Sequence, residues 1–222
     1  MSQEAPSLYT IAAGVPFVDA LALGLIARHG GDPLGLSRVT VLLPNRRAGR
    51  ALREAFLRVS GGRPLLLPQM QPLGDIDEEE LTLSAESGLE LPPAVTALRR
   101  QLLLTRLVLR RPDIGEPAQA ARFAAELARL LDQVQIERLD IAGLAGLVPA
   151  EFAAHWQITL EFLSLVTAHW PAILAAEGAI DPAVRRNLLL AAQAERWRAR
   201  PPADPIYAAG STGSIPAAAD LL

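Results

Sequence analysis

The sequence of 222 residues lacks both cysteine and lysine, so all 21 residues counted as lysine plus arginine are arginine. Without cysteine, this stretch of chain has no disulfide bond, no thiolate zinc site and no cysteine nucleophile. Without lysine, it lacks the side chain that reaches the β- and γ-phosphates in a P-loop. It also lacks the amine that Schiff-base catalysis requires. Several classes of enzyme are therefore excluded before any motif is considered.

Histidine and long apolar runs are also scarce. The three histidines, His29, His155 and His169, do not have the spacing of metal ligands, so we predict no metal site. The apolar runs are broken by Arg, Pro or Gly well before the roughly 18 residues of a membrane span. The N-terminus MSQEAPSLYT has no basic start to a signal sequence. Since 50% of the residues are hydrophobic, we expect a globular, cytoplasmic protein with no membrane contact and no cofactor in this segment.

The net charge of -3 gives no overall basic field of the kind that small DNA-binding modules carry. Any contact with nucleic acid must therefore come from a local group of arginines. The stretch VTVLLPNRRAGRALREAFL, residues 39–57, contains such a group. Its arginines are Arg46, Arg47, Arg50 and Arg53.

The same stretch changes character at Pro44, where a short apolar run rich in β-branched residues ends and an amphipathic segment follows. This pattern predicts a buried strand at Arg38–Leu43 and a helix from Arg46 to about Val59, with Asn45 as the N-cap. A strand that leads into a helix N-terminus supplies free backbone N–H groups and a favourable dipole. Guanidinium groups at the same place make this a candidate anion site, with phosphate as the favoured ligand.

Two interpretations of these arginines are open. Arg46, Arg50 and Arg53 fall at i, i+4 and i+7 on one helical stripe, and Glu54 alone among their neighbours could neutralise them. Open α/β sheets bind their ligands outside the carboxyl ends of the strands, so the stripe is placed to contact a phosphate backbone. The other interpretation is an ordinary solvated helix face.

The start of the chain resembles the opening of an α/β sheet. Ser7–Gly14 has the form of a strand that ends at a glycine, and Val15-Pro16 then opens an apolar-periodic helix to about His29. The loop between them stands where a P-loop would bind phosphate, and its residues are Ala12, Ala13, Gly14 and Val15. It has one glycine where several are needed and no Lys-Ser/Thr pair. The loop is either a dead nucleotide site in a P-loop fold or an ordinary βα turn in a Rossmann-like sheet.

Three further segments complete the expected α/β domain. Pro64–Pro68 predicts a short strand or an extended segment away from the sheet centre, because proline cannot donate to a strand ladder. Pro205–Gly210 predicts another strand, and the polar loop after it offers Ser211 and Thr212 to nucleic acid or to a neighbouring domain. A helix that starts at Ile215 is cut off by the end of the sequence, so we expect an N-terminal segment of a longer protein.

The pattern between these segments is helical. The candidate helices are Pro93–Arg110, Glu116–Gln135, Asp140–Leu147, Glu151–Glu177 and Pro182–Arg198. Pro171 lies inside the fourth, which is therefore either two helices or one kinked helix. Asp75–Glu90 is acidic and aperiodic, which favours a solvated loop over a metal site. Trp156, Trp170 and Trp197 fall on apolar helical stripes, which favours core or interface positions over base stacking.

The sequence thus predicts an α/β fold with a P-loop or Rossmann-like parallel sheet and a large all-α insertion. The α/β domain is expected at residues 1–91 plus 203–222, and the insertion at residues 92–202. The fold class does not by itself specify the function.

Several long stretches carry a family resemblance. They are VTVLLPNRRAGRALREAFL, LLLPQMQPLGDIDEEEL, LPPAVTALRRQLLLTRLVL, AARFAAELARLLDQVQIERLD, HWQITLEFLSLVTAHWPAILAAEGAIDPAVRRN and YAAGSTGSIPAAADLL. In this order they cover essentially the whole chain, which is similar to the N-terminal part of the AddB family, in particular its alphaproteobacterial branch. AddB is the second subunit of the bacterial AddAB helicase-nuclease, which processes DNA double-strand breaks.

The resemblance implies an inactivated superfamily 1 helicase domain that carries a helical insertion. In working helicases, the segment similar to residues 39–57 contacts the backbone of single-stranded DNA, so the implied contacts are Pro44, Asn45, Arg46 and Arg47. The resemblance also implies an AddA-type helicase subunit as the partner in a hetero-oligomer, and a nuclease domain that lies outside this sequence. The missing lysine departs from AddB members that retain a P-loop motif.

These observations together give one hypothesis with two alternatives. We expect the chain to bind DNA, as single strands or duplex ends, and to scaffold a double-strand break repair helicase-nuclease without being catalytic by itself. The first alternative is a Rossmann-like, phosphate-binding domain of a small-molecule enzyme. The second is a pure protein-interaction module.

Overall fold

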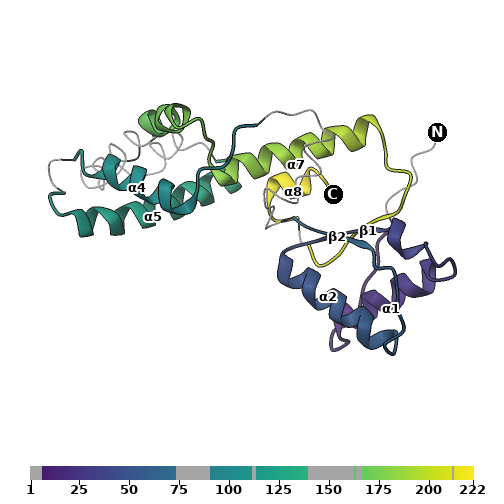
Figure 1. Cartoon of the computed structure of the whole chain (residues 1–222). Coiled ribbons are helices and arrows are strands. Elements are labelled where there is room, and N and C mark those ends of the chain that lie inside the picture. Colours follow the sequence, from purple (N-terminus) through teal and green to yellow (C-terminus); the bar gives the residue numbers. More distant parts are fainter. Residues whose placement is uncertain (1–6, 74–90, 112–113, 140–162, 164–166, 212) are drawn as a thin grey trace, which may run out of the picture. The chain divides into compact units, whose positions relative to one another are not determined.

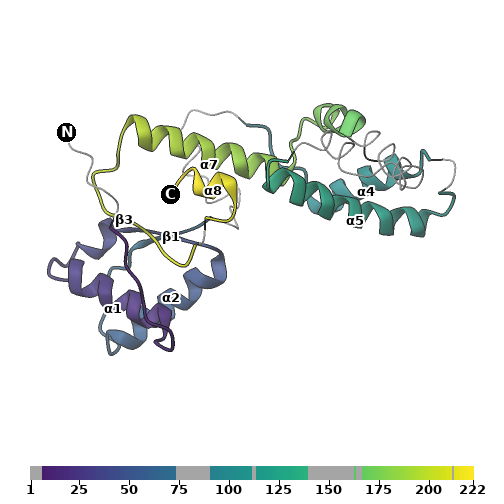
Figure 2. The same ribbon diagram turned by 180° about the vertical axis from the view of Figure 1, so that it is seen from behind.

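The structure is a computed structural model that describes residues 7–73, 91–111, 114–139, 163, 167–211 and 213–222 (Figures 1 and 2). The chain separates into two compact units. The first, here called the α/β unit, is Met1–Glu78 with Arg200–Thr212, and the second, the helical unit, is Glu79–Ala199 with Gly213–Leu222. The predicted acidic loop and the predicted helix at 140–147 lie outside the described residues.

The α/β unit contains a three-stranded parallel sheet in the order β2-β1-β3. Its strands are β1 (Thr40–Leu43), β2 (Gln69–Pro72) and β3 (Ile206–Ala208). Thr40 is in register with Gln69 on one side and with Ile206 on the other, so segments far apart in the sequence pair with the same strand. The predicted α/β class and the return of the chain to the sheet after the helices are confirmed. The layout is compatible with a Rossmann-like sheet.

Two helices, α1 (Phe17–His29) and α2 (Arg46–Val59), cover the same face of this sheet in both views (Figures 1 and 2). A short 3-10 helix, η1 (Leu36–Arg38), precedes β1. Val41 and Leu43 alternate toward the two helices, where they pack with Leu52 and Phe56 of α2 in one buried cluster. Leu52 and Phe56 are 0% and 1% exposed, and burial of each contributes about 1.5 to 3 kcal/mol. The predicted β1–α2 unit is therefore held by its apolar face, which leaves the arginine face to solvent.

The predicted first strand is wrong. Residues 7–12 pair with no strand among the described residues, and the Leu8 side chain is 94% exposed. The guanidinium of Arg28 lies 4.3 Å from the centre of the Tyr9 ring, so this segment contacts the last turn of α1 instead of the sheet. The segment has the local form of a strand, but β2 and β3 occupy both edges of β1, so it does not pair with the central strand.

The strand β2 begins just after the prolines that were expected to bound it. Residues 64–68 are extended without strand pairing, and the ladder starts at Gln69, whose N–H donates to the Val39 carbonyl at 2.9 Å. As the prolines predicted, this strand lies at an edge of the sheet. Pro72, which has no N–H to donate, is its last residue.

The helical unit consists of long helices close to the predicted ranges. They are α4 (Ala97–Val108), α5 (Pro117–Ile136), α7 (Pro182–Ala199) and the short α8 (Pro216–Ala219), with a further helical segment at 167–176. The helix α4 starts four residues later than predicted, because Ala94 forms a parallel bridge with Ile180. Pro171 lies inside the segment 167–176. Most of the predicted helix that contains it is not among the described residues.

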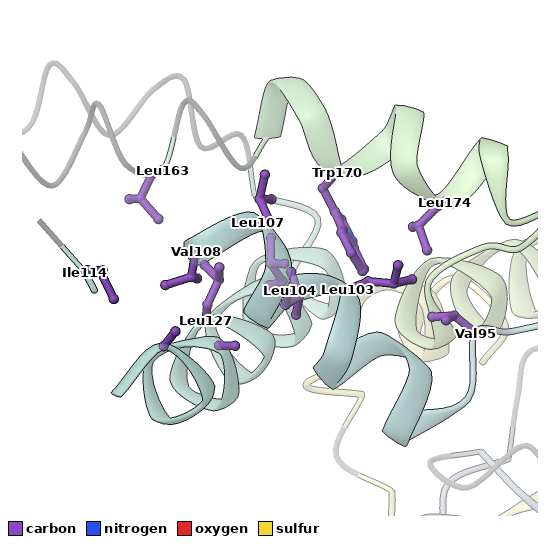
Figure 3. Packing of buried hydrophobic residues seen from close by; sticks show 13 residues of the cluster. Val95, Leu103, Leu104, Leu107, Val108, Ile114, Leu127, Leu163, Trp170 and Leu174 are labelled. Carbon is purple, nitrogen blue, oxygen red and sulfur yellow. The ribbon is translucent and has the colours of Figure 1, made fainter. Parts of the chain in front are cut away.

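Trp170 lies in the core of the helical unit, as predicted, and is 3% exposed. Figure 3 shows its ring projecting from the segment 167–176 toward Leu103 and Leu104 of α4. The cluster also contains Val95, Leu107, Val108, Ile114, Ala120, Ala124, Leu127, Leu131, Leu163 and Leu174. The tryptophan is thus a packing residue and is closed to base stacking.

A buried charged group lies beside this core. The carboxylate of Asp181, whose side chain is 2% exposed, accepts hydrogen bonds from the indole N–H of Trp170 at 2.6 Å and from the Gln135 amide at 2.9 Å. Arg100, 7% exposed, forms an ion pair with Asp181 at 2.7 Å and a second with Asp132 at 2.9 Å. The Arg100–Asp181 contact is close but does not have the angle of a directed hydrogen bond. We call Arg100, Asp181, Trp170 and Gln135 the buried polar cluster.

Candidate nucleic-acid interface

The start of α2 is fixed by a side-chain cap. Asn45 has extended backbone angles, φ -157° and ψ 171°, and its side-chain oxygen accepts a hydrogen bond from the N–H of Ala48 at 2.9 Å. This confirms Asn45 as the N-cap. The described residues before α1, α4 and α5, which are Pro16, Thr96 and Glu116, make no such bond. The chain therefore turns from β1 into α2 at a defined point, and the first residues of the helix are held in place.

All four predicted arginines of α2 are exposed. Arg46 is engaged in an interaction of its own. Across the described parts of the chain, no ion pair or hydrogen bond involves the side chains of Arg47, Arg50 or Arg53. Glu54, the one acidic residue of α2, pairs with none of them in this part of the structure. The three arginines are therefore available to an external anion.

Two carboxylates of the α/β unit pair with other arginines. Asp19 pairs with Arg58 at the far end of α2, at 2.6 Å. Asp32 pairs with Arg38. These pairs neutralise arginines away from the start of α2, so the positive charge is concentrated at Arg47, Arg50 and Arg53. This end of the helix adjoins the carboxyl end of β1, where parallel sheets place their ligands.

The carboxyl end of β3 lies beside the carboxyl end of β1. Gly210 has a φ of +69°, which a glycine adopts without strain. A Cβ atom on it would lie 3.6 Å from the Phe17 ring and 4.0 Å from Cδ of Pro44. The ends of β1 and β3 and the start of α1 therefore come together. Ser211 follows Gly210 and is engaged in an interaction, and Thr212 lies outside the described residues.

The residues in the P-loop position form an exposed turn. Val15 donates its N–H to the Ala12 carbonyl at 3.2 Å, and Gly14 has a φ of +88°. Ala12, Ala13, Gly14 and Val15 are all exposed, and nothing lies within 4 Å of the position a Cβ would take on Gly14. The turn leads through Pro16 to Phe17, so it adjoins the edge where β1 and β3 end. No strand precedes it in the described residues, which makes it a helix-leading turn and not a βα turn.

Among the described residues, no group of three or more His, Asp or Glu side chains is arranged to hold a metal ion. No helix in the same set is both long and apolar enough to cross a bilayer.

Comparisons of the chain with protein-family models, with curated proteins and with solved structures found no match.

Proposed function

We propose that this chain binds the sugar-phosphate backbone of DNA through the arginines of α2, as a non-motor, helicase-like segment of a double-strand break repair helicase-nuclease subunit. One observation carries the proposal. Arg47, Arg50 and Arg53 are exposed and lack an ion-pair partner among the described residues, and they follow the N-cap of α2, whose capping bond is formed.

The spacing of the three arginines favours a polyanion over a single phosphate group. Arg47 and Arg53 are six residues apart, which is about 9 Å along a helix at about 1.5 Å per residue. The three side chains spread over about 120° of the helix surface at about 3.6 residues per turn, and we call them the arginine stripe from here on. A nucleic-acid strand carries one negative charge about every 3.4 Å of helix axis, so these arginines span more than one phosphate. A small-molecule phosphate would engage one arginine and the helix start and leave the others unused. The stripe therefore fits a backbone better than it fits a metabolite.

The start of α2 adds neutral contacts to these charges. The first backbone N–H groups of a helix point toward an approaching anion. The Asn45 oxygen accepts the cap bond from Ala48, which leaves its amide N–H groups to donate to a phosphate oxygen. Pro44 packs near Gly210 and has no donor, so its part is to end the strand. This assigns the donor contacts to Asn45 and the arginines.

The resemblance to AddB subunits supports the wider assignment. In that assignment the chain works in a hetero-oligomer with an AddA-type helicase subunit, and the catalytic groups lie on other domains. The absence of lysine supports a segment that holds DNA without hydrolysing ATP.

The test is fluorescence anisotropy with labelled single-stranded and duplex-end DNA over a range of salt concentrations. The triple variant R47A/R50A/R53A should bind about 10- to 100-fold more weakly than the wild type, and its slope of log affinity against log salt should fall by about 2 to 3. The matched control is R110A/R122A/R200A, which removes the same charge from exposed arginines that have no ion pair among the described residues. The control should keep most of the affinity.

Other outcomes would favour the alternatives. Equal losses in the two triple variants would mean that binding depends on total charge, which contradicts a site on α2. Saturable binding of a small phosphate ester with no affinity for DNA would favour a small-molecule enzyme domain. No binding in either assay would favour an interaction module.

A further inference from the structure

We infer that Phe17 is a stacking platform for a nucleic-acid base, and that it makes this edge of the sheet prefer single-stranded over duplex DNA. The inference rests on the proposed function, because the α2 arginines must hold the backbone for a base to reach the ring. It adds a specificity-determining residue that carries no charge.

Phe17 is an aromatic side chain held at the surface beside the arginine stripe. It is the first residue of α1 and is 43% exposed. Its ring carbons lie 3.6 and 3.7 Å from the Cβ position of Gly210, and Pro44 lies within 4.0 Å of the same point. Pro44 directly precedes the N-cap Asn45, so the ring and the start of the arginine stripe are close neighbours.

The other exposed aromatic side chain at this end of the chain is already covered. Tyr9 has the guanidinium of Arg28 over its ring at 4.3 Å. Among the described residues, no cation or second ring lies against Phe17. Gly210, as a glycine, has no side chain to place beside the ring. Phe17, at 43% exposed, is therefore the aromatic side chain of this region that is partly open to solvent without a cation on its ring.

The chemistry of this arrangement distinguishes single strands from duplexes. In a duplex the bases are paired and stacked on one another, so a protein ring at the backbone has no base face to contact. In a single strand the bases are free to stack on an aromatic side chain while arginines track the phosphates. An arginine stripe with one adjoining aromatic ring has both parts of such a site.

The experiment compares F17L with the wild type by anisotropy. Leucine keeps an apolar side chain at this position and leaves the charge unchanged, but it removes the ring. The ligands are a dT oligonucleotide of about 12 nucleotides, a duplex, and an abasic strand with the same number of phosphates. F17L should bind the dT strand about 5- to 100-fold more weakly, and F17W should restore the affinity. Binding to the duplex and to the abasic strand, and the salt slope, should be unchanged. Thermal unfolding of each variant checks the fold.

Three results would overturn the inference. The first is an affinity of F17L for the dT strand equal to that of the wild type. The second is an equal loss of affinity for the dT and abasic strands, which would mean that the substitution disturbs the local structure instead of removing a base contact. In both cases the proposed function stands if R47A/R50A/R53A still lowers binding. The third is no effect of the arginine variant, which would overturn the proposed function and this inference together.

Discussion

The two units place arginine in different surroundings. In the helical unit, the buried Arg100 forms ion pairs with Asp181 and Asp132. Exposed arginines of this unit are of both kinds: Arg138 pairs with Asp220, while Arg110 and Arg122 have no ion pair among the described residues. In the α/β unit, Arg58 and Arg38 are matched similarly, but three arginines at the start of α2 are not matched within the described residues. A composition of 21 arginines and a net charge of -3 cannot separate these uses. The placement of the acidic partners separates them.

Burial explains why the helical unit needs its pairs. A guanidinium group that is 7% exposed has lost most of its hydration, so an acidic partner must offset the cost of burying its charge. An arginine on the exposed face of α2 keeps its water and needs no partner in the folded chain. The same side chain therefore organises the interior of one unit and stays available to ligands in the other.

The largest expected effect comes from removal of Asp181. In D181A, Arg100 is left without its buried partner and the Trp170 indole without its acceptor, which should cost the helical unit about 3 to 5 kcal/mol. D220A removes the exposed partner of Arg138 and should cost less than about 1 kcal/mol. Urea unfolding followed by circular dichroism measures the loss of stability in both variants. Because the two units need not unfold together, each unfolding transition is fitted separately. D181N keeps an oxygen acceptor, so its loss of stability should lie between those of D181A and D220A. Equal costs in D181A and D220A would break the comparison between buried and exposed arginine pairs.

The parts of the fold that follow from local signals were predictable. The helix α2 runs over Arg46–Val59 as expected, and Asn45 caps it, because helix periodicity, a proline stop and an N-cap residue all act within a few positions. The exposure of the α2 arginines follows from the same periodicity, since the apolar positions take the buried face. The assignment to AddB remains a prediction from resemblance.

The parts that depend on distant pairing were not predictable. Residues 7–12 have the local form of a strand, but no local signal shows that Ile206–Ala208 takes the second edge of β1. Arg100 and Asp181 lie far apart in the sequence, and neither carries a local sign of burial. Phe17 resembles an ordinary apolar helix residue until the structure places Gly210 and Pro44 beside it. In each case the deciding neighbour comes from another part of the chain.

A smaller effect is expected at the N-cap, where the comparison between the units can be sharpened. N45A removes the bond to the Ala48 N–H and should lower the stability of the α/β unit by about 1 kcal/mol. T96A at the start of α4 removes a residue that makes no side-chain cap bond, so it should have little effect. Denaturant midpoints of the two variants give the difference. DNA binding by N45A should also weaken at constant salt slope, because no charge is lost; a changed slope would contradict this.

The smallest effect is expected at the exposed pair of Arg99 and Glu177. This pair tests how much an exposed ion pair of the helical unit contributes to its stability. Two hydrogen bonds from Arg99, at 2.6 and 2.8 Å, lower the pKa of the Glu177 carboxyl below its ordinary 4.5. A lowered pKa in the folded state means that the pair stabilises the fold above the ordinary pKa and that this stabilisation is lost as pH falls through the lowered value. The stability difference between wild type and E177Q should therefore shrink between about pH 5 and pH 2. The stability difference between wild type and R99Q should shrink over the same pH range. The double variant R99Q/E177Q should be no less stable than either single variant, because each of them already removes the pair. A difference between wild type and E177Q that stays constant over this range would show that the pair contributes by packing instead of charge.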